Sequence, residues 1–232
     1  MNKDLYKYKI ELHAHTYPVS GCSEFSPYET IKQYSESGVD GIVITNHFKR
    51  DLFARKDAVK FYLDDYYAAV KEGKRRNIRV YLGVEIQFDE NPNDYLVYGI
   101  DEEWLERAVK YFPLGVKPFL RDFRGGDTVI IQAHPFRVGF GMTREPSTDG
   151  TEVYNMHPHH DSNNDLAYTY AKKHNHIIIA GSDFHHAGSQ AGGLILTKTL
   201  PADSFELAKI LKSRDYLLLV KNQVIIPSNN NL

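Results

Sequence analysis

The sequence predicts an α/β fold in which a parallel sheet is covered by helices. Three observations indicate this class: seven short apolar runs, helical patterns between most of them, and apolar rather than alternating strands, as expected of strands buried on both faces. A chain of 232 residues can bury roughly 70–75% of its unfolded surface, so we expect a single domain over residues 1–232. Seven strands could close as a barrel or form an open sheet.

The apolar runs have the length of β-strands and recur along the chain. Each is short and bounded by polar or turn residues, which is typical of strands in an α/β domain. In chain order they are Tyr8–Leu12, Gly41–Thr45, Val80–Ile86, Tyr95–Ile100, Thr128–Ala133, Gly150–Tyr154 and Ile177–Ala180.

Helical patterns fill most of the intervals between these runs. The first begins at Ser26 and Pro27, since Ser suits the N-cap and Pro the first helical position, and it stops at Gly38. The others are Lys56–Arg76, Glu103–Tyr111, Asn164–Lys173 and Asp203–Lys212.

Composition and charge exclude several classes of protein. There are 28 Lys and Arg against 30 Asp and Glu, so the net charge is −2, without the basic excess of a dedicated nucleic-acid binder. One cysteine, Cys22, allows no intrachain disulfide. No apolar run of about 18 residues predicts a membrane span. The charged N-terminus lacks an apolar signal core, so we expect a cytoplasmic protein without a membrane partner.

The 11 histidines are unevenly placed, because many follow or close a predicted strand at its carboxyl side. In a parallel barrel the carboxyl ends of the strands converge on one face, where active sites form. The sequence therefore predicts one site built from the segments HAH (13–15), TNH (45–47), GVE (83–85), AHP (133–135), EVYN (152–155) and SDFH (182–185).

These residue types indicate a metal centre. Several imidazoles and a few carboxylates suit Zn, Mn or Fe. His13 and His15, two positions apart, project to the same side of an extended chain, and Asp183 and His185 repeat this spacing. A carboxylate such as Glu85 can bridge two ions. More than four candidate ligands favour two or three divalent ions, and ions about 4 Å apart can stabilise the attacking and leaving oxygens of a displacement at phosphorus.

The motifs together resemble the polymerase and histidinol phosphatase (PHP) superfamily, over about residues 10–186. The resemblance implies a distorted (β/α)7, TIM-like barrel with a centre of two or three metals. It also implies a metal-dependent phosphoesterase acting on a small phosphate monoester such as histidinol phosphate or a nucleotide. The matching segments are HAHT (13–16), GIVITNH (41–47), GVEI (83–86), AHPFR (133–137), EVYN (152–155) and GSDFH (181–185).

The resemblance also assigns ligands. Glu85 would bridge to a second metal held by His134, while His47 and His185 resemble ligands of a third ion. The first metal group would consist of His13, His15, Glu85 and Asp183.

Three positions depart from the family pattern. Asp94 stands where the family usually has a histidine, and we expect it to be a metal ligand as well. No residue cleanly supplies the third-metal ligand that often follows the HxH motif. Cys22 lies in that region and could reach the site, but we favour its interpretation as a small buried or loop cysteine. Asn46 stands where an aspartate is common, so two metals are expected more firmly than three.

Around the ligands, Arg137 is expected to bind a phosphate oxygen, because its guanidinium suits bidentate contacts and it follows His134 by three residues. A metal-activated water would be the nucleophile, and no general acid is singled out. Asn46, Asn155 and His157 are expected to contact the ligands rather than the ions. Other histidines near the site are His159, His160 and His186, whereas His174 and His176, on the opposite face, are expected to be structural.

Two other functions remain as alternatives. An amidohydrolase-like enzyme acting on a non-phosphate substrate would typically need a bridging carboxylated lysine, but Lys49 lies in a loop and not at a strand end. A non-catalytic, metal-binding regulatory domain would be expected to lack ligands. Nucleic acid is a less favoured substrate. The basic cluster of Lys71, Lys74, Arg75 and Arg76 is typical of a solvated helix end, and Arg121 with Arg124 form only a minor cluster. Neither cluster is an aromatic-lined groove for a single strand.

Overall fold

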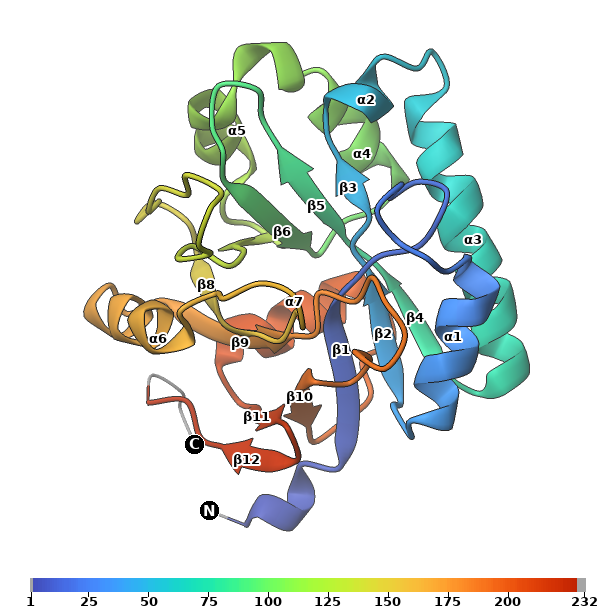
Figure 1. The fold of residues 1–232 in the computed structure, drawn as a ribbon, viewed down its shortest axis with the longest axis vertical. Coiled ribbons are helices and arrows are strands. Elements are labelled where there is room, and N and C mark those ends of the chain that lie inside the picture. The colour runs from blue at the N-terminus through green and yellow to red at the C-terminus, as the bar shows by residue number, and fades with distance from the viewer. Residues whose placement is uncertain (1, 229–232) are drawn as a thin grey trace.

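The computed structural model describes residues 2–228 and confirms the α/β class (Figure 1). The helices are α1 (Pro27–Glu36), α2 (Arg50–Phe53), α3 (Ala58–Arg76), α4 (Glu102–Val109), α5 (Val116–Phe123), α6 (Asn164–Lys173) and α7 (Ser204–Ser213), with short 3-10 turns at Lys3–Leu5 and Phe112–Leu114. The strands are β1 (Tyr8–Ala14), β2 (Gly41–Ile44), β3 (His47–Phe48), β4 (Arg79–Leu82), β5 (Val84–Gln87), β6 (Asp94–Tyr98), β7 (Val129–Gln132), β8 (Gly150–Asn155), β9 (Ile177–Gly181), β10 (Gly193–Thr197), β11 (Leu217–Val220) and β12 (Gln223–Ile225).

The strands form two mixed sheets of six strands each, with helices on their outer faces (Figure 1). The order in one sheet is β12-β11-β10-β1-β2-β4, and in the other β3-β5-β6-β7-β8-β9. Helices α1 and α3 pack side by side next to β2 and β4 (Figure 1). The closed, distorted (β/α)7 barrel stays a prediction, because the strands are described as two separate sheets.

The expectation of a parallel sheet is wrong for part of the structure. Strand β6 runs antiparallel to both of its neighbours, β5 and β7, and β10, β11 and β12 are also paired antiparallel. The reason for β6 is the short connection from β5, residues 88–93, because a parallel crossover needs a dozen or more residues. This reversal brings the beginning of β6 to the same end as the carboxyl ends of β5 and β7.

Most predicted elements are present, with small shifts. Ser26 is the N-cap of α1 and Pro27 its first residue, as expected, and a capping box with Glu29 is added to them. Helix α6 has the predicted bounds. The run Val80–Ile86 divides into β4 and β5 at Gly83. Helix α5 and strands β10 to β12 were not expected. In α5, Val116, Phe119, Leu120 and Phe123 nonetheless recur at helical spacing and are buried.

The two sheets approach each other where the site lies. Ala14 and Phe184 form an isolated parallel bridge between the ends of β1 and β9, and the amide of His15 donates to the carbonyl of Phe184 at 3.1 Å. On the other side, the amide of Glu85 donates to the carbonyl of Asn46 at 3.1 Å. The strand ends that carry polar residues are therefore fixed by backbone hydrogen bonds.

Among residues 2–228, no helix is long and apolar enough to cross a membrane. The cytoplasmic location stays a prediction.

Candidate metal centre

The residues predicted to bind metal come together at one end of the strands. Asp94 reaches this end because it begins the reversed strand β6, whereas the other candidates lie at or after strand carboxyl ends. Three groups of side chains have donor atoms within 4.8 Å of one another: His13 with His15 and Asp183, His13 with Glu85 and His134, and His15 with His47 and His185.

His13 and His15 face each other and share two carboxylates. His13 Nε2 lies 3.0 Å from His15 Nε2, and both atoms are 3.4 Å from Asp183 Oδ1. Glu85 is 3.2 Å from His13 Nε2 and 3.5 Å from His15 Nε2. All four side chains are buried, so their polar atoms need partners inside the protein.

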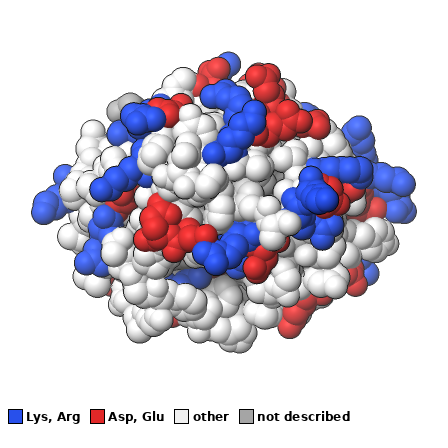
Figure 2. Space-filling model, turned by 90° about the horizontal axis from the view of Figure 1, so that it is seen from above, with Lys and Arg blue, Asp and Glu red and all other residues white. Residues whose placement is uncertain are grey.

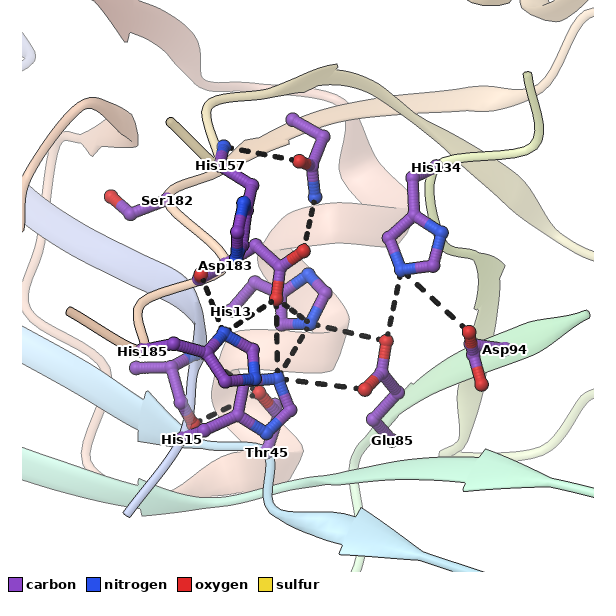
Figure 3. Close-up of polar contacts among 12 residues, drawn as sticks. His13, His15, Thr45, Glu85, Asp94, His134, His157, Ser182, Asp183 and His185 are labelled. Carbon is purple, nitrogen blue, oxygen red and sulfur yellow. Dashed lines mark hydrogen bonds and ion pairs between the residues drawn. The ribbon is translucent and has the colours of Figure 1, made fainter. Parts of the chain in front are cut away.

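Glu85 lies between this group and His134 (Figure 3), and it also contacts His47. Its Oε1 is also 3.2 Å from His134 Nε2, and its Oε2 is 2.8 Å from His47 Nδ1. On its other side His134 Nε2 is 3.8 Å from Asp94 Oδ2. This is the position expected of a bridging carboxylate.

The distances and hydrogen bonds fit divalent ions. Two ligands about 2.1 Å from one tetrahedral ion are about 3.4 Å apart, close to the 3.0–3.5 Å between these donors. His13 Nδ1 is 2.8 Å from Glu152 Oε1, and His15 Nδ1 is 3.1 Å from Ser20 Oγ. These partners assign the ring protons to Nδ1 and leave the Nε2 lone pairs facing each other. A cation shared by both lone pairs would remove their repulsion.

The two central carboxylates are anionic. Burial opposes the ionisation of Glu85, but the neighbouring imidazoles of His13 and His47 hold its pKa well below the usual range. Burial likewise opposes the ionisation of Asp183, whose pKa is held well below the usual range by His13 and Arg137. Both groups therefore carry the charge that a metal ligand requires. Asp94 differs, because burial and the charge of Glu85 raise its pKa to about 6.

The third group is a stack of imidazoles next to the only cysteine. The ring centroid of His15 lies 4.4 Å from that of His47 and 4.2 Å from that of His185. Cys22 Sγ lies 3.2 Å from His47 Nε2. Partial burial raises the pKa of Cys22, but contacts with His185 and His47 outweigh it and lower the pKa to about 6. The favoured interpretation of Cys22 as a buried or loop cysteine does not account for this contact, whereas the alternative that it reaches the site does.

Two buried carboxylates hold the ligands in place. Glu11 was not predicted to lie at the site, and Glu152 lies in the predicted segment EVYN (152–155) but was given no role there. Glu152 accepts from His13 Nδ1 through Oε1 and from the amide of His134 at 3.1 Å through Oε2. Glu11 accepts from the amides of His13 and Ser182, each at 2.9 Å. A charged residue inside an apolar strand, as in IELHA and GTEVYN, is the sequence signal that could have found both.

Asn155 and Asn46, the two asparagines predicted to contact the metal ligands, do so differently: Asn155 directly and Asn46 through Ser20. Asn155 Nδ2 donates to Glu152 Oε2 at 2.9 Å and to Asp183 Oδ2 at 3.1 Å, so it touches a candidate ligand directly. Asn46 instead accepts from Ser20 Oγ at 2.8 Å, and Ser20 in turn contacts His15. Asn46 therefore acts on His15 through the loop that follows β1.

Arg137 and His157 lie at the site, but not free in the cavity. Arg137 Nη2 donates to Asp183 Oδ2 and to Asn155 Oδ1, while its buried Nε donates no hydrogen bond. The His157 ring is 5.4 Å from that of His185, and burial lowers its pKa to about 3. His157 is therefore a neutral imidazole near a candidate ligand.

Two candidate ligands adopt backbone conformations that residues other than glycine rarely take. The φ angle is +28° at His134 and +50° at Asp183, both just after a strand. Such conformations cost about 1–3 kcal/mol each and occur often at functional sites, where the surrounding structure enforces them. At Gly181, an added Cβ would lie 2.6 Å from both Glu152 Oε1 and His13 Cβ, so the strands approach closely here.

The metal centre opens into a cavity of about 340 Å³. Its lining includes Glu85, Asp94, His134 and Asp183, together with Lys49, Arg137, Phe140, His157, His159, His160 and His186. By contrast, His176 lies before β9 and contacts Thr151 Oγ1 at 2.9 Å, and the His174 ring is 5.6 Å from it. These two histidines are outside the site, as expected.

Comparison with known proteins gives a consistent result. The PHP domain family matches residues 11–222. No curated protein matches the sequence.

Solved structures share the fold. A two-domain protein from Bacteroides vulgatus that contains a predicted PHP-like metal-dependent phosphoesterase has a TM-score of 0.62 at 15% identity, over 95% of this chain and 67% of its own. A proposed metal-dependent phosphoesterase from Bifidobacterium adolescentis has a TM-score of 0.53 at 16% identity, over 89% of this chain and 96% of its own. An amidohydrolase from Chromobacterium violaceum, with bound sulfate and no metal, has a TM-score of 0.56 at 16% identity, over 87% of this chain and 96% of its own.

Proposed function

The chain belongs to the PHP domain family, and from this premise we propose that it is a hydrolase that cleaves a phosphate monoester with the help of divalent metal ions. The observation that carries the proposal is the cluster around Glu85, whose two oxygens contact His13, His134 and His47 within 3.2 Å. A carboxylate shared by several imidazoles is suited to a multinuclear metal centre.

The proposed ligand sets follow the three groups of side chains. Glu85 would connect the first ion to a second one held by His134 and Asp94, and a third group lies at His47 and His185. The first ion would be held by His13, His15, Glu85 and Asp183. Bound Zn, Mn or Fe ions supply Lewis acidity toward the phosphate and lower the pKa of a water molecule.

The chain's own residues orient these ligands and the substrate. Glu152 and Ser20 fix the His13 and His15 rings through Nδ1, so that Nε2 of each faces the centre. Arg137 lines the cavity, and we propose that donors not used by Asp183 and Asn155 bind a phosphate oxygen.

We also propose that the two sheets together form the distorted seven-stranded barrel. The support is the pair of junctions between them: the bridge Ala14–Phe184 joins β1 to β9, and β4 continues into β5 through Gly83. Counting β2 with β3 and β4 with β5 as single interrupted strands, the order β1, β2/β3, β4/β5, β6, β7, β8, β9 returns to β1.

A small phosphate ester is preferred to nucleic acid as substrate. Figure 2 shows Lys and Arg side chains interspersed with Asp and Glu on the face that it presents. The basic clusters noted in the sequence are also partly neutralised, since Arg76 pairs with Glu72 and Arg124 with Asp149. The face shown therefore offers no continuous positive groove of the kind that a nucleic-acid backbone requires.

The proposal is tested by removing metals with a chelator, restoring Zn, Mn or Fe one at a time, and measuring hydrolysis of p-nitrophenyl phosphate and of p-nitroanilide amides. We expect metal-dependent release of phosphate and no amide cleavage. Amide cleavage without phosphate release would favour the amidohydrolase alternative, and bound metal with neither activity would favour a regulatory domain. A screen of amino-acid, sugar and nucleotide phosphates would then identify the substrate.

A further inference from the structure

We propose that Asp65, a buried carboxylate of α3, is a positioning residue of the metal centre, which orients His15 through Asn46 and Ser20 and keeps the Nε2 atom of His15 free to bind metal. The inference rests on the metal centre of the proposed function. It gives a role to an acidic residue that belongs to none of the predicted motifs, on a helix that carries none of the candidate ligands.

Asp65 is an unusual residue for the buried face of a helix. It is 6% exposed, and its Oδ2 accepts from Thr16 Oγ1 and from Asn46 Nδ2, the latter at 2.7 Å. Both donors are neutral, so hydrogen bonds stabilise the carboxylate but neither contact supplies an opposite charge. A buried carboxylate of this kind costs stability that a neutral side chain of similar shape would not cost. Helix packing alone therefore does not explain an acidic residue here.

Asn46 connects this carboxylate to the loop that follows β1. An ionised carboxylate can only accept hydrogen bonds, so the NH₂ group of Asn46 must face Asp65. The amide oxygen Oδ1 of Asn46 therefore points the other way, where it accepts from the amide of Thr16 at 2.6 Å and from Ser20 Oγ at 2.8 Å. Because the Thr16 amide can only donate, it supports the same assignment of oxygen and nitrogen.

Ser20 connects Asn46 to two candidate ligands. Its single hydroxyl proton is donated to Asn46 Oδ1. The Ser20 oxygen therefore accepts from both of its other neighbours, the amide of His47 at 2.9 Å and His15 Nδ1 at 3.1 Å. It follows that His15 carries its ring proton on Nδ1, and that the lone pair of its Nε2 faces His13 Nε2, 3.0 Å away, in the centre.

The hydrogen bonds of this chain all point toward Asp65. His15 donates to Ser20, Ser20 to Asn46, and Asn46 to the carboxylate. Hydrogen bonds in such a chain polarise one another, so the negative charge at its end makes His15 Nε2 a better donor to a cation. A carboxylate in direct contact with a histidine ligand has this effect, and here two side chains stand between the carboxylate and the ligand.

The same arrangement makes an asparagine suitable at position 46, where an aspartate is common in the family. With Asp65 Oδ2 2.7 Å from Asn46 Nδ2, an aspartate at position 46 would bring two carboxylates into contact, and both could not be ionised. The structure instead has the charge at position 65 and an amide at position 46. We therefore expect the charge to support His15 from either position, provided that the other position holds an amide.

The experiment exchanges the two side chains and uses zinc as the probe. Zinc affinity is measured by competition with a chromogenic chelator for wild type, Asp65→Asn, Asn46→Asp and the double variant that carries both changes. The protein is kept above pH 7, because burial raises the pKa of the Asp65 carboxyl to about 6 and the group must be ionised. Asp64→Asn is the matched control, since Asp64 is an exposed neighbour on the same helix that pairs with Lys60.

We expect both single variants to bind zinc about 3–10-fold less tightly than wild type, which is less than the 10–100-fold loss typical when a residue that touches the ligand is removed. The double variant should recover most of this affinity, because it restores one carboxylate and one amide. Asp64→Asn should behave as wild type. Unchanged zinc affinity in Asp65→Asn, or losses that simply add in the double variant, would overturn the inference.

The proton position of His15 gives a reading that a merely structural role would not change. Nitrogen NMR of zinc-free, ¹⁵N-labelled wild type should show His15 protonated on Nδ1. Asp65→Asn should populate the form protonated on Nε2, and the double variant should return the ring to Nδ1. A wild type that binds zinc and hydrolyses p-nitrophenyl phosphate, but whose His15 is protonated on Nε2, would overturn this inference and leave the proposed function standing. Wild type that binds no zinc would overturn both.

Discussion

Glu152 is the residue whose replacement tests most specifically how this site prepares its ligands. It is fully buried, and it accepts from three donors: His13 Nδ1 at 2.8 Å, the amide of His134 at 3.1 Å and Asn155 Nδ2 at 2.9 Å. In Glu152→Gln only one of the two oxygen positions keeps an acceptor. The amide oxygen can accept either from His13 or from His134 and Asn155, but not from both sides. If it faces His134 and Asn155, the new NH₂ group faces His13 and requires Nδ1 to accept.

That change would move the His13 proton to Nε2, the atom that faces the other ligands. Loss of such a supporting contact typically weakens metal binding 10–100-fold, which corresponds to about 1.4–2.8 kcal/mol. We therefore expect Glu152→Gln to bind metal about 10–100-fold less tightly and to lose phosphatase activity at limiting metal.

The assay is competition between the protein and a chromogenic chelator, followed by turnover at low and at saturating metal. Glu106→Gln, which removes one charge at an exposed position of α4, is the matched control and should behave as wild type. An unchanged metal affinity in folded Glu152→Gln would refute the reasoning that this carboxylate sets the proton position of His13.

Three further predictions concern stability. Burial raises the pKa of Asp65 from 3.8 to about 6. Between these two pH values the folded state therefore binds more protons than the unfolded state. The free energy of unfolding consequently falls as the pH rises through this range, by about 3 kcal/mol in total. Asp65→Asn should therefore gain stability relative to wild type between pH 4 and pH 7 in urea unfolding of chelated protein, and a difference that is the same at both pH values would contradict this. Gly181→Ala should lose about 1–3 kcal/mol of stability through overpacking against Glu152 and His13, with weaker metal binding, and unchanged metal affinity would count against the close approach. Metal at 100 times its dissociation constant should raise the melting temperature by about 5–10 °C over chelated protein, and identical melting curves would argue against a metal centre.

The sequence was sufficient for residues whose role depends on strand position. The end of an apolar strand predicted where His13, His134 and Asp183 lie, because carboxyl ends of strands meet at one edge whatever the loops do. Asp94 was identified through a family motif alone. Its place follows from the reversed β6. The eight residues between the predicted strands, 87–94, are too few for a parallel crossover and could have indicated this reversal.

The remaining roles depend on contacts between segments far apart in the chain. Glu152 contacts His13 across 139 positions, and nothing near either residue predicts that pairing. Asn46 was placed beside the ligands by its motif, yet its side chain is directed to the Ser20 loop. Cys22 was set aside because cysteines in loops are common, and only the folded loop brings its sulfur to His47.

The central claim is that these side chains bind metal ions that are needed to hydrolyse a phosphate ester. The most direct measurement is the metal content of wild type and His134→Ala, together with their turnover of p-nitrophenyl phosphate. We expect wild type to bind at least two ions per chain and to release phosphate, and His134→Ala to hold fewer ions and to lose most of the turnover. Wild type without bound metal, or equal turnover in the two proteins, would contradict the claim.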